Sequence, residues 1–240
     1  MRLKRMMQGV GMVYVFLLLG LVCPSLFTEN QIKERAQEVS YPNASSYMAA
    51  TVEEKPKIAI TFDDGPNAEC TPKLLDGLQK RGVKATFFLI GQNIEKGSNR
   101  EIVKRMYEEG HLIGNHTYHH VEITRVSNEK AYEELMMCNE LIQSITGQEV
   151  EYMRPPFGLW QKELEQKIHV LPVMWNVDPL DWATENVDEI VNKVVTRTEE
   201  NDIILLHDCY DSSVKAALRI IDLLQAEGFE FVTVDEIILD

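Results

Sequence analysis

The 240-residue sequence predicts an α/β domain with parallel strands, and three observations support this prediction. Short apolar, β-branched runs alternate with helical patterns from Lys55 to the end of the sequence. Glycines follow four of the helical patterns, where helices commonly end. Polar motifs follow several apolar runs, as they do at the carboxyl ends of strands in such folds. Strands joined by helical crossovers form either an open doubly wound sheet or a closed barrel, and the pattern leaves both open.

The region before Lys55 has a different composition. Three basic residues among the first five precede the uncharged stretch Met6–Phe27, a pattern typical of an export signal or anchor helix. No clear cleavage site follows, so residues 1–27 are either a cleaved signal peptide or an uncleaved signal anchor. The polar residues 28–54 are predicted to be a linker. We therefore expect residues 55–240 at the extracellular face of the cell envelope, secreted or touching the membrane only through the N-terminal segment.

The net charge and the number of cysteines argue against two further classes of protein. The formal net charge is −14, which argues against nucleic acid as a partner. Three cysteines outside the N-terminal stretch are too few and too scattered for a disulfide framework. Cys138 is predicted to be a buried helix residue, whereas Cys70 and Cys209 follow strand ends, and a bridge between these two is an alternative to free thiols. We expect a monomer.

Seven strands and six helices are predicted after the linker. The strands are expected at Lys57–Phe62, Ala85–Ile90, Leu112–Asn115, Tyr152–Arg154, Val170–Asn176, Ile203–His207 and Phe231–Val234. The helices are expected at Thr71–Arg81, Asn99–Glu109, Ser127–Thr146, Gln161–Lys167, Val187–Thr198 and Ser212–Glu227. The glycines that end helices are Gly82, Gly110, Gly147 and Gly228.

Two adjacent carboxylates, Asp63 and Asp64, follow the first predicted strand, and Gly65-Pro66 prevents its continuation. Adjacent residues of a strand point to opposite sides, so the two carboxylates can serve different roles if the strand end curls over a pocket. Crowded carboxylates also repel each other and favour a nearby cation or hydrogen-bond donor. A simple turn is the alternative for this segment taken alone.

A histidine-rich segment follows the third predicted strand. His116 and His120 are four residues apart, which places both imidazoles on one face of a helical turn and points His119 elsewhere. Together with one carboxylate of Asp63-Asp64, they would form a three-ligand metal site with positions open for water and substrate. A histidine-rich surface turn is the alternative.

Three more strand ends carry polar or aromatic residues. Arg154 precedes two prolines and can hold a carboxylate in a bidentate contact, and the amide of Phe157 is free to point at a ligand. Asp181 adds a carboxylate beside Trp182, whose flat ring can form the wall of a sugar site. His207 emerges from the buried run Ile203–Leu206.

Together these motifs resemble the five motifs of the polysaccharide deacetylases, carbohydrate esterase family 4. The segments that carry the resemblance are Thr61–Gly65, His116 to His120, Arg154–Gly158, Asp178 to Trp182 and Leu205 to Asp208. The resemblance extends over residues 55–240 and implies a distorted (β/α)7 barrel. It also implies metal-dependent removal of acetyl groups from N-acetylated sugars.

The resemblance assigns roles by position. It implies a single divalent ion held by Asp64, His116 and His120. Zinc suits this ligand set best, and cobalt, nickel or iron are alternatives.

The catalytic roles follow in the same way. The resemblance implies Asp63 as general base, oriented by Arg154, and His207 as general acid, oriented by Asp181.

The substrate roles fall to three residues. The Phe157 amide would donate to the oxyanion, although the family often has Tyr at this position. Trp182 and Leu205 would line the pocket for the sugar and the acetyl methyl group. Cys209-Tyr210 departs from the familiar pattern, which leaves the shape of that rim open.

The expected substrate is an N-acetylated polysaccharide, with peptidoglycan N-acetylglucosamine first because the signal implies export. Chitin oligomers and poly-N-acetylglucosamine are alternatives. A barrel that only binds glycan would lack Asp63, His207 or a metal ligand, and none is missing here. A structural envelope protein anchored in the membrane would not need five polar strand ends.

Overall fold

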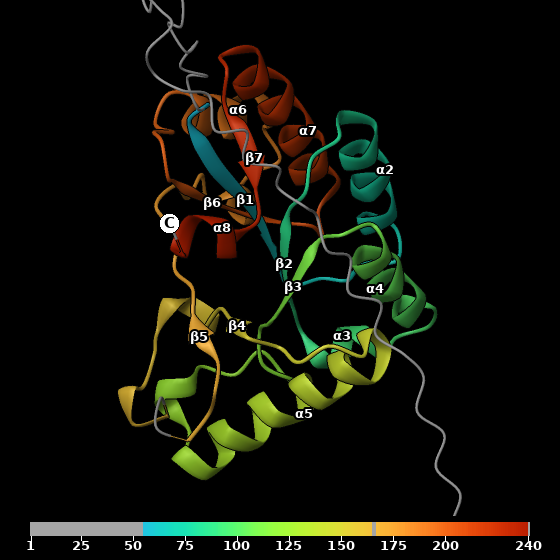
Figure 1. The fold of residues 1–240 in the computed structure, drawn as a ribbon, viewed down its shortest axis with the longest axis vertical. Coiled ribbons are helices and arrows are strands. Elements are labelled where there is room, and N and C mark those ends of the chain that lie inside the picture. Colours follow the sequence, from blue (N-terminus) through green and yellow to red (C-terminus); the bar gives the residue numbers. More distant parts are fainter. Residues whose placement is uncertain (1–54, 165–166, 240) are drawn as a thin grey trace, which may run out of the picture. The chain divides into compact units, whose positions relative to one another are not determined.

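The computed structural model describes residues 55–164 and 167–239, and these residues form one α/β unit (Figure 1). The predicted signal segment and linker therefore lie outside the described residues. Seven parallel strands form a single sheet in the order β5-β4-β3-β2-β1-β6, with β7 paired to the first half of β1. Among the described helices, none is long and apolar enough to cross a membrane.

The strands and helices alternate along the chain. The strands are β1 (Lys57–Asp63), β2 (Thr86–Leu89), β3 (Leu112–Asn115), β4 (Tyr152–Met153), β5 (Leu171–Pro172), β6 (Ile203–His207) and β7 (Glu230–Val232). The α-helices are α2 (Thr71–Arg81), α3 (Gly91–Ile94), α4 (Asn99–Glu108), α5 (Asn128–Thr146), α6 (Val187–Val195), α7 (Asp211–Ala226) and α8 (Val234–Ile238). The prediction of an α/β domain with seven parallel strands is confirmed.

The sheet curves into a half-barrel rather than a fully paired barrel. In the described part of the chain β5 and β6 form no ladder, and an isolated bridge between Val177 and Ile204 spans the gap. Strand β5 is much shorter than the predicted Val170–Asn176. The Val173 N–H still donates to the Met153 carbonyl of β4, but the carbonyl of Val173 accepts a hydrogen bond from the Arg154 side chain instead of from a strand.

Three helices differ from the prediction: α3 and α8 were not expected, and one expected helix is mostly missing among the described residues. Residues of the expected helix Gln161–Lys167 form only a short 3-10 turn at Lys162–Leu164, and residues 165–166 are not described. Helix α8 begins where a strand was expected to continue to Val234. Thr233 caps this helix, with Glu236 bonding back to the Thr233 N–H in a capping box. The Thr-x-x-Glu spacing was visible in the sequence.

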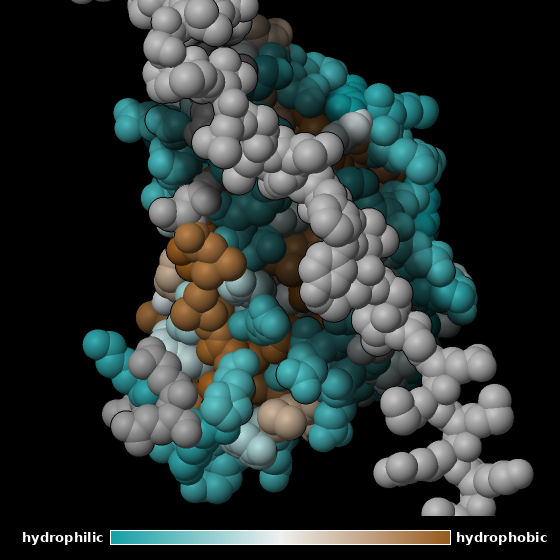
Figure 2. Space-filling view, in the orientation of Figure 1, coloured by the Kyte–Doolittle hydropathy of each residue, from teal (hydrophilic) through white to brown (hydrophobic). Residues whose placement is uncertain are grey.

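The two faces of the strands pack against different layers. On β1, Ile60 and Phe62 are fully buried against the surrounding helices, whereas Ala59 points into the half-barrel. Helix α8 closes the amino end of the interior, where the Val234 N–H donates to Thr86 Oγ1. Polar residues cover the outer helices, and apolar residues gather over β5 and the C-terminal end (Figure 2). The carboxyl end of the half-barrel interior is therefore the end at which the polar side chains lie.

Candidate active site

The two adjacent carboxylates lie at the carboxyl end of β1. Asp63 is the last residue of the strand, pairs with His207 of β6 and is 3% exposed. Asp64 has a left-handed backbone with φ of 71°, so the chain curls over the end of the half-barrel. As a result both carboxylates line one cleft. This is the condition under which the sequence predicted different roles for them.

The close approach of Asp208 explains the glycine after Asp64. A Cβ atom added to Gly65 would lie 2.5 Å from both carboxylate oxygens of Asp208. Asp208 is fully buried, accepts a hydrogen bond of 2.5 Å from Thr71 Oγ1, and has a pKa raised to about 7 by its burial. Only glycine fits between this carboxylate and the loop.

The histidine segment is not a helical turn, so this part of the prediction was wrong. The His116 N–H still pairs with the Leu89 carbonyl of β2, and Thr117 and His120 then adopt positive φ angles of 61° and 57°. Asn115 Oδ1 accepts a hydrogen bond from the Thr117 N–H and supports this reversal. The turn nevertheless brings the rings of His116 and His120 to a centroid distance of 5.0 Å.

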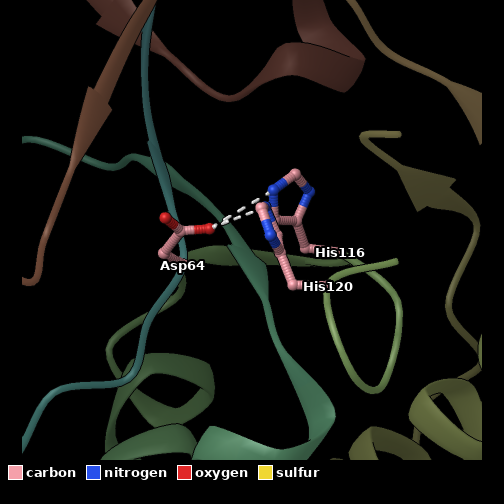
Figure 3. A group of neighbouring side chains, drawn as sticks. All are labelled: Asp64, His116 and His120. Atoms are coloured by element: carbon pink, nitrogen blue, oxygen red, sulfur yellow. Dashed lines mark ion pairs between the residues drawn. The ribbon is translucent and has the colours of Figure 1, made fainter. Parts of the chain in front are cut away.

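Asp64, His116 and His120 converge at one point (Figure 3). Asp64 Oδ1 lies 3.4 Å from His116 Nε2 and 3.3 Å from His120 Nε2, and one ligand atom from each residue lies within 4.8 Å of the others. Asp64 Oδ1 is buried and has no hydrogen-bond partner among the described residues. Two imidazoles and an unpartnered carboxylate oxygen fit a divalent cation.

The neighbours of the three residues prepare them for a cation. His116 Nδ1 lies 2.6 Å from the Arg154 carbonyl and donates a hydrogen bond to it, which leaves Nε2 free to bind. Burial alone would raise the pKa of Asp64, but its contact with His116 and the charges of His116, His120 and His207 lower the pKa overall. Burial and the charge of His116 lower the pKa of His120. The ionised carboxylate and neutral imidazole are the metal-binding forms.

His119 points away from this site, as the sequence suggested. Its Nδ1 lies 2.9 Å from Glu134 Oε1, and its N–H donates to Glu134 Oε2 at 2.8 Å. The Glu134 side chain is fully buried in α5.

Arg154 is fully buried inside the half-barrel and contacts Asp63 through one N–H only. Its Nη1 donates to Asp63 Oδ1 at 2.8 Å and to Thr61 Oγ1 at 2.6 Å. The remaining donors bond to the carbonyls of Val173 and Met174. The prediction of a bidentate contact is therefore wrong, because carbonyls of the segment after β5 accept the hydrogen bonds of the other guanidinium nitrogens. Arg154 still makes one hydrogen bond to Asp63.

On the opposite side of the cleft, Asp181 holds His207 by two hydrogen bonds. Its carboxylate lies 2.8 Å from His207 Nδ1 and accepts from the His207 N–H at 2.9 Å. Nδ1 is thereby occupied, so Nε2 is the nitrogen free to act in the cleft. Burial opposes the charged ring, but Asp181, Asp63 and Asp64 outweigh it and raise the pKa of His207 to about 9.

The cleft between these two sides has a volume of about 450 Å³. Of the predicted substrate residues, Leu205 is buried at its base, and Phe157 and Trp182 are 63% and 57% exposed. Phe157 has a positive φ of 61°, and its N–H has no partner among the described residues. Residues that line the cleft but were not assigned a role from the sequence are Pro155, Trp175, Asp178, Leu180 and Tyr210.

The family of the chain follows from its similarity to known proteins. Residues 50–174 match the model of the polysaccharide deacetylase family. The chain belongs to this family. It is similar to the peptidoglycan-N-acetylglucosamine deacetylase PgdA of Listeria monocytogenes, with 31% identity over 92% of this chain and 49% of the relative. Identity to a peptidoglycan-N-acetylglucosamine deacetylase of Bacillus cereus is 39%, over 75% of this chain and 67% of the relative.

The chain spans about half the length of the Listeria relative. Among solved structures, the peptidoglycan deacetylase PdaC from Bacillus subtilis has a TM-score of 0.74 and 36% identity, over 77% of this chain and 90% of that chain. A family 4 acetyl xylan esterase from Clostridium thermocellum, in complex with a cobalt ion, has a TM-score of 0.70 and 32% identity, over 75% and 89%. Both share the half-barrel fold with parallel strands.

Several residues that support the site were not indicated by the sequence. Glu134 holds His119, and Asn93 and Asn99 contact the loop after Asp63. They lie on helices, where polar residues are common and carry no motif. The three described cysteines, Cys70, Cys138 and Cys209, are free, so the alternative bridge is not formed.

Proposed function

We propose that this chain hydrolyses the N-acetyl group of N-acetylglucosamine units in an extracellular glycan, with peptidoglycan as the first candidate, and releases acetate. The observation that carries the proposal is the division of one cleft. A three-ligand cation site and a buried carboxylate lie on one side, and a histidine with a raised pKa lies on the other. Amide hydrolysis needs both a base for water and an acid for the leaving amine.

A divalent ion held by Asp64, His116 and His120 would polarise the acetyl carbonyl and acidify a water molecule. Zinc fits the ligand set best, with cobalt, nickel or iron as alternatives. These residues suit the ion because two imidazoles and an ionised carboxylate present ligand atoms to the same point.

Asp63 accepts the proton of the attacking water. Its Oδ2 lies 3.8 Å from His116 Nε2, so the carboxylate is next to the cation site while Oδ1 bonds to Arg154. Arg154 has few other positions available, since its guanidinium group is packed over the ring of Phe88 with a distance of 4.3 Å to the ring centre. The packing of Arg154 inside the half-barrel thus sets the orientation of Asp63, the proposed base.

His207 donates a proton to the leaving amine through Nε2, and Asp181 keeps the ring oriented and protonated. The free N–H of Phe157 donates to the carbonyl oxygen as negative charge develops on it. Trp182 stacks against the sugar ring, and Leu205 contacts the acetyl methyl group at the base of the cleft.

The names of the relatives favour a peptidoglycan substrate, since the Listeria and Bacillus proteins are called peptidoglycan deacetylases. The basic start and the uncharged stretch Met6–Phe27 support export of the chain, secreted or held at the outer face of the membrane. Chitin oligomers and poly-N-acetylglucosamine carry the same acetamido group and remain alternatives, as one rhizobial relative is named a chitooligosaccharide deacetylase.

Acetate release tests the proposal. The full-length chain is stripped of metal with a chelator, reloaded with zinc, and given peptidoglycan, chitin oligomers, poly-N-acetylglucosamine and acetylated xylan in parallel. We expect zinc-dependent acetate release from peptidoglycan to be the fastest. Faster release from acetylated xylan would instead identify an esterase, and release from no substrate would indicate a glycan-binding protein.

A further inference from the structure

The loop that carries Asp64 is held through its backbone by the segment that runs from the end of β2 to the first residue of α4. Asn93 Nδ2 donates to the Asp64 carbonyl at 2.8 Å, and the Ile90 N–H donates to the Gly65 carbonyl at 3.1 Å. Asn99 Nδ2 donates to the Pro66 carbonyl at 3.0 Å. Three consecutive carbonyls of the loop therefore receive hydrogen bonds from one neighbouring segment.

The loop needs such support because its backbone is unfavourable. Asp64 has a φ of 71°, and a left-handed conformation is unfavourable at a residue other than glycine. Such conformations persist only where the surroundings fix them. Pro66 has no N–H, so the loop has one donor fewer with which to stabilise itself.

The two asparagines are linked to each other by a hydrogen bond. Asn99 is 3% exposed, and its Nδ2 makes a second hydrogen bond of 2.7 Å to the Asn93 carbonyl. Asn99 stands in the first turn of α4, yet its side-chain amide donates towards the loop, and the N-cap residue Ser98 makes no side-chain capping bond among the described residues. The position of Asn93, and with it the bond to Asp64, is therefore tied to the start of α4.

We propose that Asn93 and Asn99 are positioning residues that set the metal affinity of the site by fixing the backbone of Asp64. This inference rests on the metal site proposed above. The side chain of Asp64 leaves the backbone directly beside the carbonyl that Asn93 holds, so a change in this loop moves the carboxylate relative to His116 and His120.

The opposite side of the loop is attached independently. The Asn67 N–H donates to Thr71 Oγ1 at 2.8 Å, and Thr71 Oγ1 donates to Asp208. Removing the Asn93 amide therefore leaves the loop tethered to α2 and, through Thr71, to Asp208 after β6, so the variant is expected to fold with Asp64 displaced.

The test compares Asn93→Ala with Gln92→Ala in the full-length chain. Both residues are half-buried side-chain amides of α3, but Gln92 makes no side-chain hydrogen bond to the loop. The zinc dissociation constant is measured on the metal-free protein by competition with a chromophoric chelator. We expect Asn93→Ala to weaken zinc binding by about 10- to 100-fold, the usual effect of losing a group that orients a ligand, and Gln92→Ala to change it by less than about twofold.

A second variant, Asn99→Asp, is nearly isosteric but replaces the donor with an oxygen facing two carbonyls. Asn99→Asp should also weaken zinc binding. The activity of Asn93→Ala should recover at saturating zinc. A purely structural role predicts a lower Tm of the metal-free protein with an unchanged zinc dissociation constant, and that result for Asn93→Ala would overturn the inference. Wild-type protein that binds no zinc would overturn this inference and the proposed metal site together.

Discussion

The two sides of the cleft are built in different ways. On the cation side, Asp64, Thr117 and His120 all have positive φ angles, between 57° and 71°, and lie in irregular turns. On the acid side, His207 is the last residue of a regular strand paired to β1, and its two hydrogen bonds to Asp181 hold it. The cation side thus depends on backbone turns fixed by neighbouring segments, and the acid side depends on one charged pair at a strand end.

This difference predicts separable consequences. Changes on the cation side should alter metal binding and, through it, turnover. Changes on the acid side should alter turnover and its pH dependence, with metal content unchanged. Asp63 lies between the two, since it approaches His116 yet is bonded to Arg154 rather than held as a ligand.

The largest effect is expected from His120→Ala, which should lose both bound metal and acetate release because one of three ligands is gone. His119→Ala is the matched control, since His119 contacts Glu134 instead of the cation site. Elemental analysis of the purified variants checks this. Loss of metal in the His119 variant with metal retained in the His120 variant would contradict the ligand assignment.

Asp63→Asn should abolish measurable turnover while the metal stays bound, because the amide cannot accept the proton of the water. Metal content and acetate release are measured on the same preparation. If metal and activity disappear together, Asp63 is a ligand and the roles of the two carboxylates are wrongly divided.

His207→Ala should lower turnover by a factor on the order of 10²–10⁴, the usual size for a lost general acid, with metal content unchanged. Acetate release at saturating substrate measures this effect. Turnover close to that of the unaltered protein would place the acid elsewhere.

Asp181→Asn should have a smaller effect on turnover and should change its pH dependence. The acid works while His207 is protonated, so activity should fall as the pH rises through the His207 pKa of about 9. Removing the Asp181 charge lowers that pKa, and the alkaline limb of the pH–rate profile should therefore move to lower pH. If the alkaline limb does not move, the ionisation of His207 is not what sets it.

Much of this arrangement could be predicted from the sequence because it depends on local pattern and chain order. Strand ends place residues at one edge of a parallel sheet, so Asp63, His116, Arg154 and His207 were expected to meet. The helical geometry proposed for the His116 turn failed, because the i, i+4 spacing also fits a turn with two left-handed residues.

Other features depend on tertiary contacts that no local pattern encodes. Arg154 makes a single contact to Asp63 because the segment after β5 occupies its other donors. Asn93 and Glu134 support the cation side from helices that are far from the motifs in sequence. The α8 helix, by contrast, was predictable from its capping box.

The separation of the two sides is tested most directly by measuring bound metal and acetate release together for His120→Ala and His207→Ala. We predict that the His120 variant loses both and that the His207 variant keeps its metal while losing turnover. If His207→Ala also releases the metal, or if His120→Ala keeps both metal and turnover, the division of the cleft into a cation side and an acid side is wrong.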